Sequence, residues 1–253
     1  MAEDNTNGIR INKALAQAGL CSRRQADAFI SSGKVRLNGE IVLELGLRVN
    51  DGDVLELGGK KVAVRPQKQA DFIYLMLNKP VEVVSTVSDP EGRRTVVDLL
   101  PDEYAGKRLF PVGRLDYFSE GLLLLTNDGE LTLRLTHPGF HLLKYYEVLL
   151  REDPDASALE AMRSGMTLAE GEKLAPVQVK RLGRQKRGTL IEMTLNQGVN
   201  RQIRRMCRDL GLTILRLRRT GQGSLRLAGL EAGKCRPLEL SEVAGLKKAV
   251  GLV

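Results

Sequence analysis

Four consecutive leucines, Leu122–Leu125, follow Gly121 and end at the turn-forming residues Thr126-Asn127-Asp128-Gly129. A short run without a polar residue, bounded by turn formers, predicts a β-strand in the protein core. The segment before it, residues 113–120, is polar and carries one carboxylate, Asp116. Gly113 and Gly121 allow unusual backbone angles on either side, and the buried strand would anchor the loop. The fold must therefore hold an acidic side chain in a loop that is fixed directly to the core.

Asp116 has other possible interpretations. A single aspartate before a strand is most often a turn former or a helix cap. Asp116 and Glu120 resemble the carboxylate pair of a glycosidase, but the chain has no tryptophan for a sugar-binding cleft. The two histidines, His137 and His141, lack further ligands that zinc would require, so we expect them to be structural and expect no metal site.

The distribution of charge favours an anionic partner. The chain of 253 residues has a formal net charge of +8 and a pI of about 9.5. Residues 180–219 contain twelve Lys or Arg residues and only two acids, Glu192 and Asp209, a net charge of +10. The odd number of widely separated cysteines and the absence of a signal or membrane-spanning pattern predict a soluble, cytoplasmic protein.

Residues 8–65 contain helix-capping and turn motifs that predict a small separate domain. Apolar residues recur at helical spacing from Ile11, and Ser22-Arg23-Arg24-Gln25 is a capping box that predicts the start of a second helix. Residues 35–37 and the run from Ile41 are predicted strands on either side of Asn38-Gly39, a pair favoured in type I′ hairpin turns. This pattern resembles the RNA-binding domain named after ribosomal protein S4. The resemblance implies an RNA-facing surface that contains Arg23, Arg24, Lys34 and Arg36.

The rest of the chain predicts a second, larger domain. Residues 66–71 are polar and predict a linker. Residues 72–243 alternate short apolar runs, among them strands at 73–77 and 83–86, with helical stretches, which is typical of an α+β domain around a mixed sheet. Residues 244–253 are expected to form a weakly ordered tail.

A helix that begins near Asn200 is predicted to be amphipathic. Ile203, Met206, Cys207 and Leu210 recur at the spacing of one buried face, and Gly211 ends the helix. The opposite face is basic and comprises Arg201, Arg204, Arg205 and Arg208. A solvated basic face would fit this spacing equally well.

Together the motifs resemble the RsuA/RluB-type pseudouridine synthases, which isomerise uridine in ribosomal RNA. The resemblance covers about residues 9–243 and is carried by three segments: Gly113-Arg114-Leu115-Asp116 with the leucine strand, Lys144-Tyr145-Tyr146-Glu147-Val148, and residues 196–206. A strand that leads to Lys79-Pro80 resembles a further family motif, in which Glu82 stands where the family usually has glycine. Ser119 replaces the family's usual threonine and keeps its hydroxyl group.

The resemblance implies a role for each matched residue. Asp116 would be the catalytic carboxylate, Arg204 would pair with it and keep it ionised, and Tyr146 would stack on a uridine flipped out of its helix. Arg114 would fill the gap that the flipped base leaves. The remaining RNA-binding residues would be Lys79, Lys144, Arg201, Arg205 and Arg208. Asp116 could attack C1′ or C6 of the nucleotide, or take a proton from C2′.

We therefore predict a pseudouridine synthase that acts as a monomer, without a cofactor, on ribosomal RNA or on a ribosomal subunit precursor. Residues 121–131 match the branch that acts on large-subunit 23S rRNA best, while a small-subunit 16S rRNA enzyme remains an alternative. A protein of another class, a noncatalytic ribosome-assembly factor, would have the same basic surfaces. Such a protein would not need Asp116 in its most basic region.

Overall fold

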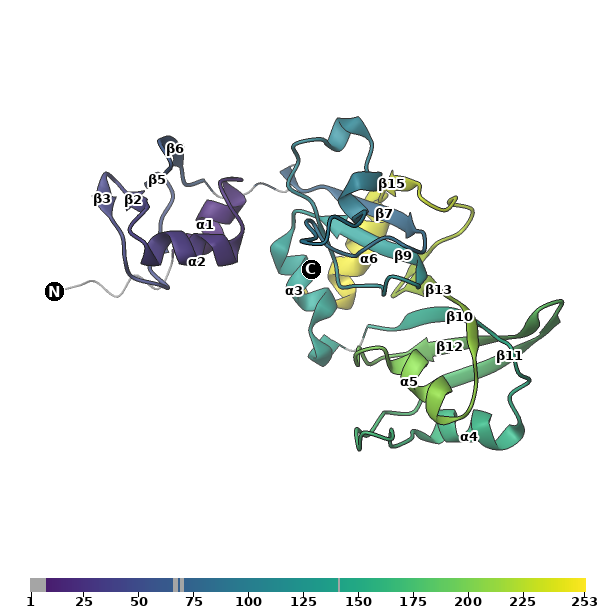
Figure 1. Ribbon diagram of the computed structural model, residues 1–253. Helices are drawn as coiled ribbons and strands as arrows, with labels where there is room; N and C mark the ends of the chain where they lie inside the picture. The colour runs from purple at the N-terminus through teal and green to yellow at the C-terminus, as the bar shows by residue number, and fades with distance from the viewer. Residues whose placement is uncertain (1–7, 66–67, 69–70, 141) are drawn as a thin grey trace. The chain divides into compact units, whose positions relative to one another are not determined.

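The computed structural model describes residues 8–65, 68, 71–140 and 142–253 of the chain. These residues divide into two compact units, Met1–Phe72 and Ile73–Val253 (Figure 1). Of the predicted linker 66–71, only Lys68 and Asp71 are among the described residues, and His141 also lies outside them.

The first unit combines two helices with short strands. The helices are α1 (Ile11–Gln17) and α2 (Arg23–Ser31), and β1 (Ile9–Arg10) pairs with β4 (Arg48–Val49). A four-stranded antiparallel sheet has the order β3-β2-β5-β6, comprising β3 (Glu40–Ile41), β2 (Val35–Leu37), β5 (Val54–Leu57) and β6 (Lys60–Ala63).

Local sequence signals determine how these elements begin and end. The Ser22 hydroxyl accepts a hydrogen bond from the Gln25 backbone N–H at 3.2 Å, and the Gln25 side chain accepts from the Ser22 N–H at 2.9 Å, which confirms the capping box. Asn38 and Gly39 both have positive φ, at 51° and 93°, as a type I′ turn requires. Ile11 of α1, Ile30 of α2 and Val35 of β2 are fully buried in the core of this unit.

The second unit is built on a nine-stranded sheet. The main path has the order β11-β12-β10-β13-β9-β7-β15, while β8 adds to β9 and β14 to β13. All described pairs are antiparallel except β13 with β9, so the sheet is mixed, as predicted. The strands are β7 (Tyr74–Lys79), β8 (Phe110–Pro111), β9 (Glu120–Thr126), β10 (Lys144–Leu150), β11 (Gln178–Gln185), β12 (Gly188–Leu195), β13 (Ile214–Gln222), β14 (Leu225–Arg226) and β15 (Cys235–Pro237).

The helices cover different parts of this sheet. Leu246 and Val250 at the C-terminal end pack with Met76 of β7, and Figure 1 shows α6 against β7 and β9. Met162 and Met206 instead pack over β10 and β12. The helices of this unit are α3 (Gly129–Thr136), α4 (Ala156–Ser164), α5 (Gln202–Asp209) and α6 (Leu240–Ala249), with 3-10 turns η2 (Val96–Leu99), η3 (Asp102–Tyr104) and η4 (Pro138–Phe140). None of the helices in the described ranges has the length and apolar content needed to cross a bilayer.

The leucine run forms most of β9 and is buried on both faces of the sheet. Leu122 and Leu124 belong to the cluster beneath α3 and α6, whereas Leu123 and Leu125 belong to a second cluster around Val96. Successive side chains of a strand point to opposite faces, so a strand covered on both sides needs an uninterrupted apolar run. The prediction of a core strand here is confirmed.

Gly121 allows β9 and β13 to approach each other closely. Its φ is +108°, and a Cβ atom built there would lie 2.2 Å from the carbonyl oxygen of Arg219. The parallel pairing of the two strands is confined to Glu120–Gly121 and Arg218–Arg219. Because only glycine has no Cβ atom, this residue sets the distance between the Asp116 loop and β13.

Two structural predictions are wrong. Residues 83–86 form no strand, only an isolated bridge between Val84 and Thr95, because the chain has just turned through Glu82 at a φ of +63°. That left-handed conformation explains why glycine suits this position.

The expected tail at 244–253 is also wrong, because α6 occupies most of it. Val243, Leu246 and Val250 recur at helical spacing and are buried, and Val250 is only 1% exposed. Arg236 pairs with Glu242 through two contacts of 2.7 Å near the first turn. Arg134 of α3 donates to the carbonyl oxygens of Val250 and Gly251 at the other end. Packing against the sheet therefore stabilises a helix with a weak local signal.

Candidate active site

Asp116 lies in the loop between β8 and β9, and several main-chain contacts determine the path of this loop. Gly113 adopts a φ of +76°. The Ser85 hydroxyl donates to the carbonyl oxygen of Leu115 at 2.8 Å and accepts from its N–H at 3.1 Å. The Ser119 N–H donates to the carbonyl oxygen of Asp116 at 3.0 Å, closing a tight turn. The loop is thus fixed by its backbone, and the Asp116 side chain is left available.

Lys79 supports this loop from inside the protein and is not part of an RNA-facing surface, so its predicted RNA-binding role is wrong. Its side chain is fully buried at the end of β7. The ammonium group donates to the carbonyl oxygens of Pro80 at 2.8 Å, Asp116 at 3.2 Å and Ser119 at 2.8 Å. Burial lowers the pKa of Lys79 to about 8, against the opposing influence of the Asp116 and Glu120 carboxylates. Three carbonyl acceptors match the three donors of an ammonium group.

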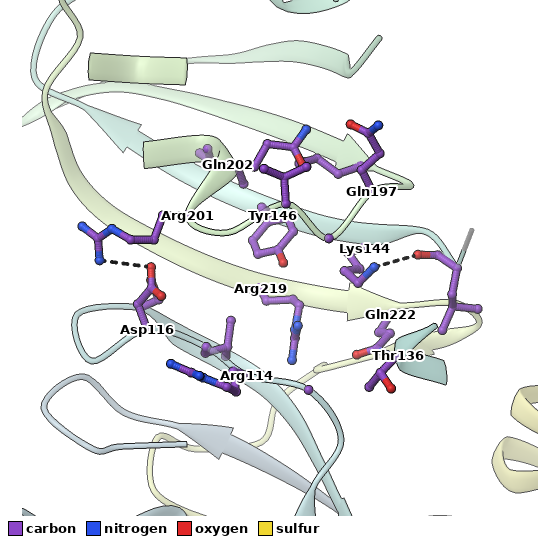
Figure 2. A pocket seen from close by; sticks show the side chains of 18 of the residues that line it. Arg114, Asp116, Thr136, Lys144, Tyr146, Gln197, Arg201, Gln202, Arg219 and Gln222 are labelled. Atoms are coloured by element: carbon purple, nitrogen blue, oxygen red, sulfur yellow. Dashed lines mark hydrogen bonds and ion pairs between the residues drawn. The ribbon is translucent and has the colours of Figure 1, made fainter. Parts of the chain in front are cut away.

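The Asp116 carboxylate forms ion pairs with two arginines at the start of α5. Oδ2 lies 3.4 Å from Nε of Arg204 and 3.6 Å from Nη1 of Arg201, and the latter contact is drawn in Figure 2. The predicted pairing of Arg204 with Asp116 is confirmed. Arg201, expected to contact phosphate, also pairs with the carboxylate, and its left-handed backbone, φ +50°, immediately precedes α5.

Arg204 is held by more than this ion pair. Its Nη2 donates to the carbonyl oxygen of Phe118 at 2.7 Å and to the hydroxyl of Ser119 at 2.9 Å. Burial lowers the pKa of Arg204 from its usual value, and the Asp116 carboxylate opposes that effect. The hydroxyl that serine shares with threonine is therefore used as a hydrogen-bond acceptor. Arg204 connects α5 to the loop independently of the carboxylate.

Asp116 opens into a cavity of about 450 Å³. Tyr146 and Lys144 of β10 line it, as does Arg114, which precedes Asp116 by two residues and is exposed. Tyr146 lies between Asp116 and Lys144 in the view of Figure 2. Burial and the nearby Arg219 lower the pKa of Lys144. The structure thus brings Arg114, Asp116, Lys144, Tyr146, Arg201 and Arg204 to one site.

Arg205 and Arg208 lie outside this group, and their predicted contact with phosphates is not supported. Neither lines the cavity. Arg205 pairs with Glu170 at 3.1 Å and with Glu172 at 2.6 Å, and Arg208 pairs with Glu170 at 2.6 Å and with Asp209 at 2.7 Å. These carboxylates neutralise both arginines and attach the turn around Glu170 to α5.

Three buried polar residues that line the cavity are not identified by the sequence motifs. Gln202 of α5 and Arg219 and Gln222 of β13 are 5%, 3% and 2% exposed. Arg219 had a weak signal, because it is a charged residue in the strand that follows the predicted helix. Its Nε donates to the carbonyl oxygen of Leu122 at 2.7 Å, across 97 residues of sequence. The contact depends on the pairing of β13 with β9, which the sequence does not predict.

The basic residues predicted in the first unit are accessible. Arg23 and Arg24 occupy the first turn of α2 and are exposed, as are Lys34 and Arg36 around the start of β2. Arg36 donates to the carbonyl oxygen of Gly39 at 2.9 Å within the hairpin. In neither unit do the described residues include a group of three His, Cys, Asp or Glu side chains that could hold a metal ion.

Comparisons with known proteins identify both units. A family profile described as RNA pseudouridylate synthase matches residues 73–209, and an S4 domain profile matches residues 9–55. The chain is 38% identical over 240 residues to the ribosomal large subunit pseudouridine synthase B of Bacillus subtilis, covering 94% of this chain and 95% of that protein. It is 35% identical over 244 residues to the dual-specificity RNA pseudouridine synthase RluF of Escherichia coli strain K12, covering 96% of this chain and 80% of that protein.

A solved structure agrees with these sequence matches. A crystal structure of a pseudouridylate synthase superimposes with a TM-score of 0.65 at 29% identity, covering 94% of this chain and 99% of that one. The sequence matches extend over both units, and the segments around Asp116, Tyr146 and Arg204 fall within the profile match. The chain belongs to the RNA pseudouridine synthase family, in its RsuA/RluB group, and its first unit is an S4 domain.

Proposed function

We propose that this enzyme converts one uridine of large-subunit ribosomal RNA to pseudouridine, with Asp116 as its catalytic carboxylate. The observation that carries the assignment of Asp116 is its position: a 30% exposed carboxylate that pairs with two arginines at the edge of a cavity lined by Tyr146. The choice of large-subunit RNA is supported by the similarity to the Bacillus subtilis enzyme along nearly the whole chain. A noncatalytic RNA-binding factor would have no use for this arrangement.

The chemistry requires one reactive group and a shaped cavity. The bond between N1 of uracil and C1′ of the sugar breaks, the base turns, and C5 bonds to C1′. C5 releases its hydrogen as a proton and N1 takes up a proton, so the product is an isomer of uridine. The reaction involves no net oxidation or reduction. Asp116 would act on the sugar or the base, and Arg204 and Arg201 would hold its orientation. Arg204 is itself fixed by Phe118 and Ser119, so the carboxylate has a rigid partner.

The target nucleotide must leave its helix to reach Asp116. A flipped base would stack on Tyr146. Stacking of a base on an aromatic side chain generally contributes about 1–3 kcal/mol to binding. Arg114, exposed at the cavity, is placed to enter the gap in the RNA helix. Lys144 would contact the substrate at the end of the cavity away from Asp116 (Figure 2).

We further propose that one chain suffices for activity and that it works in the cytoplasm on free rRNA or on a ribosomal subunit precursor. All lining residues of the cavity belong to the second unit of a single chain. The first unit would dock on RNA near the target. Its S4 domain and exposed arginines support that role.

Replacing Arg23 and Arg24 together with alanine is expected to weaken RNA binding and to reduce its dependence on salt. Each lost phosphate contact reduces the magnitude of the slope of log K against log salt concentration by about 0.7–0.9. The slope of the double variant should therefore be smaller in magnitude by about 1.4–1.8. Binding would be measured by titration at several salt concentrations. The double replacement of Lys60 and Lys61 removes the same charge from β6 and should leave the slope nearly unchanged. An equal decrease in both variants would contradict a specific docking role for α2.

The activity should fall above pH 8 as Lys79 loses its proton. With a pKa of about 8, Lys79 would be mostly a neutral amine at pH 9, which can donate only two of its three hydrogen bonds to the Asp116 loop. We expect kcat to decrease about 15-fold between pH 8 and pH 9.5. Unfolding would not explain this loss. Between pH 8 and 10.5 Lys79 is mostly deprotonated in the folded protein but still protonated in the unfolded chain. The unfolded chain therefore binds more protons than the folded protein, and the contribution of Lys79 to the free energy of unfolding increases with pH over that interval.

The measurement is a pH profile of single-turnover rates, with thermal unfolding followed at each pH. Lys144 also has a lowered pKa, so Lys144→Met serves as the control. The decline should persist in this variant at a lower absolute rate. A profile that is flat to pH 9.5, or a decline that disappears with Lys144, would rule out Lys79 as its source.

The proposed function is tested on fragments of unmodified large- and small-subunit rRNA. After incubation with the purified protein, pseudouridine would be mapped by carbodiimide adducts and reverse-transcription stops. We expect a single new stop in large-subunit RNA. A stop only in small-subunit RNA would correct the choice of subunit. Tight binding without a stop in free RNA or in subunit precursors would favour the assembly factor.

A further inference from the structure

Two side chains of β13 carry polar atoms whose hydrogen bonds are not satisfied within the part of the chain that the structure describes. Nη2 of Arg219 and Oε1 of Gln222 are buried and have no hydrogen-bond partner there. Both residues line the cavity next to Asp116. Leaving a buried donor or acceptor unpaired costs about 1–3 kcal/mol, so such atoms inside a binding cavity indicate groups that a ligand would complete.

The sheet places both residues beside the proposed stacking residue. In the antiparallel register Tyr146 lies opposite Arg219, and Lys144 lies opposite Gln222. Arg219 and Gln222 are three positions apart, which would put them on opposite faces of a regular strand. A register shift between Tyr145 and Tyr146 leaves Thr220 as an additional residue of β13. This bulge brings both side chains to the cavity.

The order of the side chains along the cavity corresponds to the outline of uracil. Figure 2 shows Asp116 at one end, Gln222 at the other, and Arg219 with Tyr146 between them. The nucleotide carries N1, bonded to the sugar, followed around the ring by the C2 carbonyl and N3–H. A base stacked on Tyr146 with its glycosidic bond at Asp116 therefore directs O2 toward Arg219 and N3–H toward Gln222.

We propose that Arg219 and Gln222 recognise the flipped uracil: Nη2 of Arg219 donates to O2, and Oε1 of Gln222 accepts from N3–H. This inference rests on the proposed function, because it uses the stacking position at Tyr146. The Arg219 guanidinium is preorganised for this contact, because its Nε donates a hydrogen bond to the carbonyl oxygen of Leu122. Cytosine is rejected because its N3 has no hydrogen and would direct a lone pair at the Gln222 oxygen.

The same two hydrogen bonds suit the product. Pseudouridine forms when the detached base turns about the line through N3 and C6, which brings C5 to the place of N1. That rotation leaves N3–H in position and exchanges O2 with O4. Gln222 therefore keeps its donor, and Arg219 meets a carbonyl oxygen before and after the turn. The pair guides the base through the rotation without having to move.

The test compares RNA fragments that carry uridine or 3-methyluridine at the target position, since the methyl group removes the N3–H donor. For the wild-type enzyme we expect kcat/KM to fall about 100-fold or more on methylation. Gln222→Ala removes the acceptor and leaves room for the methyl group. Its kcat/KM for uridine should be about 10–100-fold below wild type, while its values for the two substrates should agree within about threefold.

Matched variants separate recognition from folding. Gln178→Ala, at an exposed position of β11, should retain the wild-type discrimination. Gln222→Met fills the same buried space without an acceptor and should lose activity on uridine to a similar degree as Gln222→Ala. The role of Arg219 is tested with RNA that carries 2-thiouridine at the target position. We expect this substrate to lower kcat/KM of the wild-type enzyme. Arg219→Met should have a low kcat/KM that is nearly the same for uridine and 2-thiouridine.

The outcomes distinguish this inference from the proposed function. If the wild type converts uridine but Gln222→Ala and Gln222→Met discriminate against 3-methyluridine as strongly as the wild type, the inference is wrong and the enzymatic function stands. If the wild type converts neither substrate in RNA that it binds, the proposed function fails and the inference fails with it. Thermal unfolding of each variant identifies any loss that is due to misfolding.

Discussion

Asp116→Asn is expected to abolish pseudouridine formation, lowering the single-turnover rate by at least about 10⁴-fold, equivalent to about 5.5 kcal/mol of transition-state stabilisation. Asparagine has the same shape but neither the charge nor the nucleophilic and basic character of the carboxylate. The loop should keep its conformation, because Lys79 and Ser119 donate to the main-chain carbonyl of residue 116 and not to its side chain. Arg204 also keeps its contacts with Phe118 and Ser119.

The rate would be measured by release of tritium from C5 of labelled uridine, and RNA affinity by direct binding. Asp153→Asn is a suitable control, since Asp153 also pairs with an arginine, Arg181, but does not line the cavity. We expect the control to be as active as the wild type and both variants to bind RNA normally. A variant at position 116 that retains a tenth of the activity would show that the carboxylate is not the reactive group.

Gly121→Ala is expected to have the largest effect on stability, lowering the free energy of unfolding of the second unit by about 4 kcal/mol. The added Cβ atom would lie 2.2 Å from the carbonyl oxygen and 2.7 Å from the nitrogen of Arg219, and the φ of +108° is unfavourable for alanine. Backbone atoms cannot yield as a flexible side chain can. The short parallel pairing of β9 with β13 would be disrupted, and with it the position of Arg219 relative to the Asp116 loop.

Urea unfolding followed by circular dichroism would measure this effect. Gly129→Ala is the matched control, because Gly129 begins α3, has an ordinary φ, and has nothing within 4 Å of the position that a Cβ atom would occupy. That substitution should be neutral or stabilising by up to about 1 kcal/mol, owing to the higher helix propensity of alanine. If Gly121→Ala unfolded at the same urea concentration as the wild type, the close approach of the two strands would not constrain residue 121 as the geometry indicates.

Local features were predicted well where neighbouring residues alone determine them. The capping box at Ser22 and Gln25 forms between residues three apart, and the Asn38-Gly39 turn depends on two backbone conformations. The burial of β9 follows from four consecutive leucines. The buried stripe of α5, with Ile203, Met206 and Cys207, follows from helical periodicity.

The errors arose where packing overrides the local signal. Residues 244–253 have little helical signal of their own, and α6 is stabilised by burying Leu246 and Val250 against the sheet. The family resemblance placed Lys79 among the RNA-binding residues, yet its ammonium group is buried and donates to three carbonyl groups, which is unusual for lysine. Arg205 was assigned to RNA because the acids that pair with it, Glu170 and Glu172, are more than thirty residues away in the sequence.

By itself, the sequence predicted the strand that anchors the Asp116 loop and the two-part organisation of the chain. The family resemblance singled out Asp116, Tyr146 and Arg204 as candidate site residues. Only the tertiary structure decided how these side chains meet, because the contacts join distant segments: Arg204 reaches Ser119 across 85 residues, and Arg219 reaches Leu122 across 97. Local propensity does not fix the register of β10, β13 and β9. Burial of the shared sheet fixes it, and that register places Arg219 and Gln222 in the cavity.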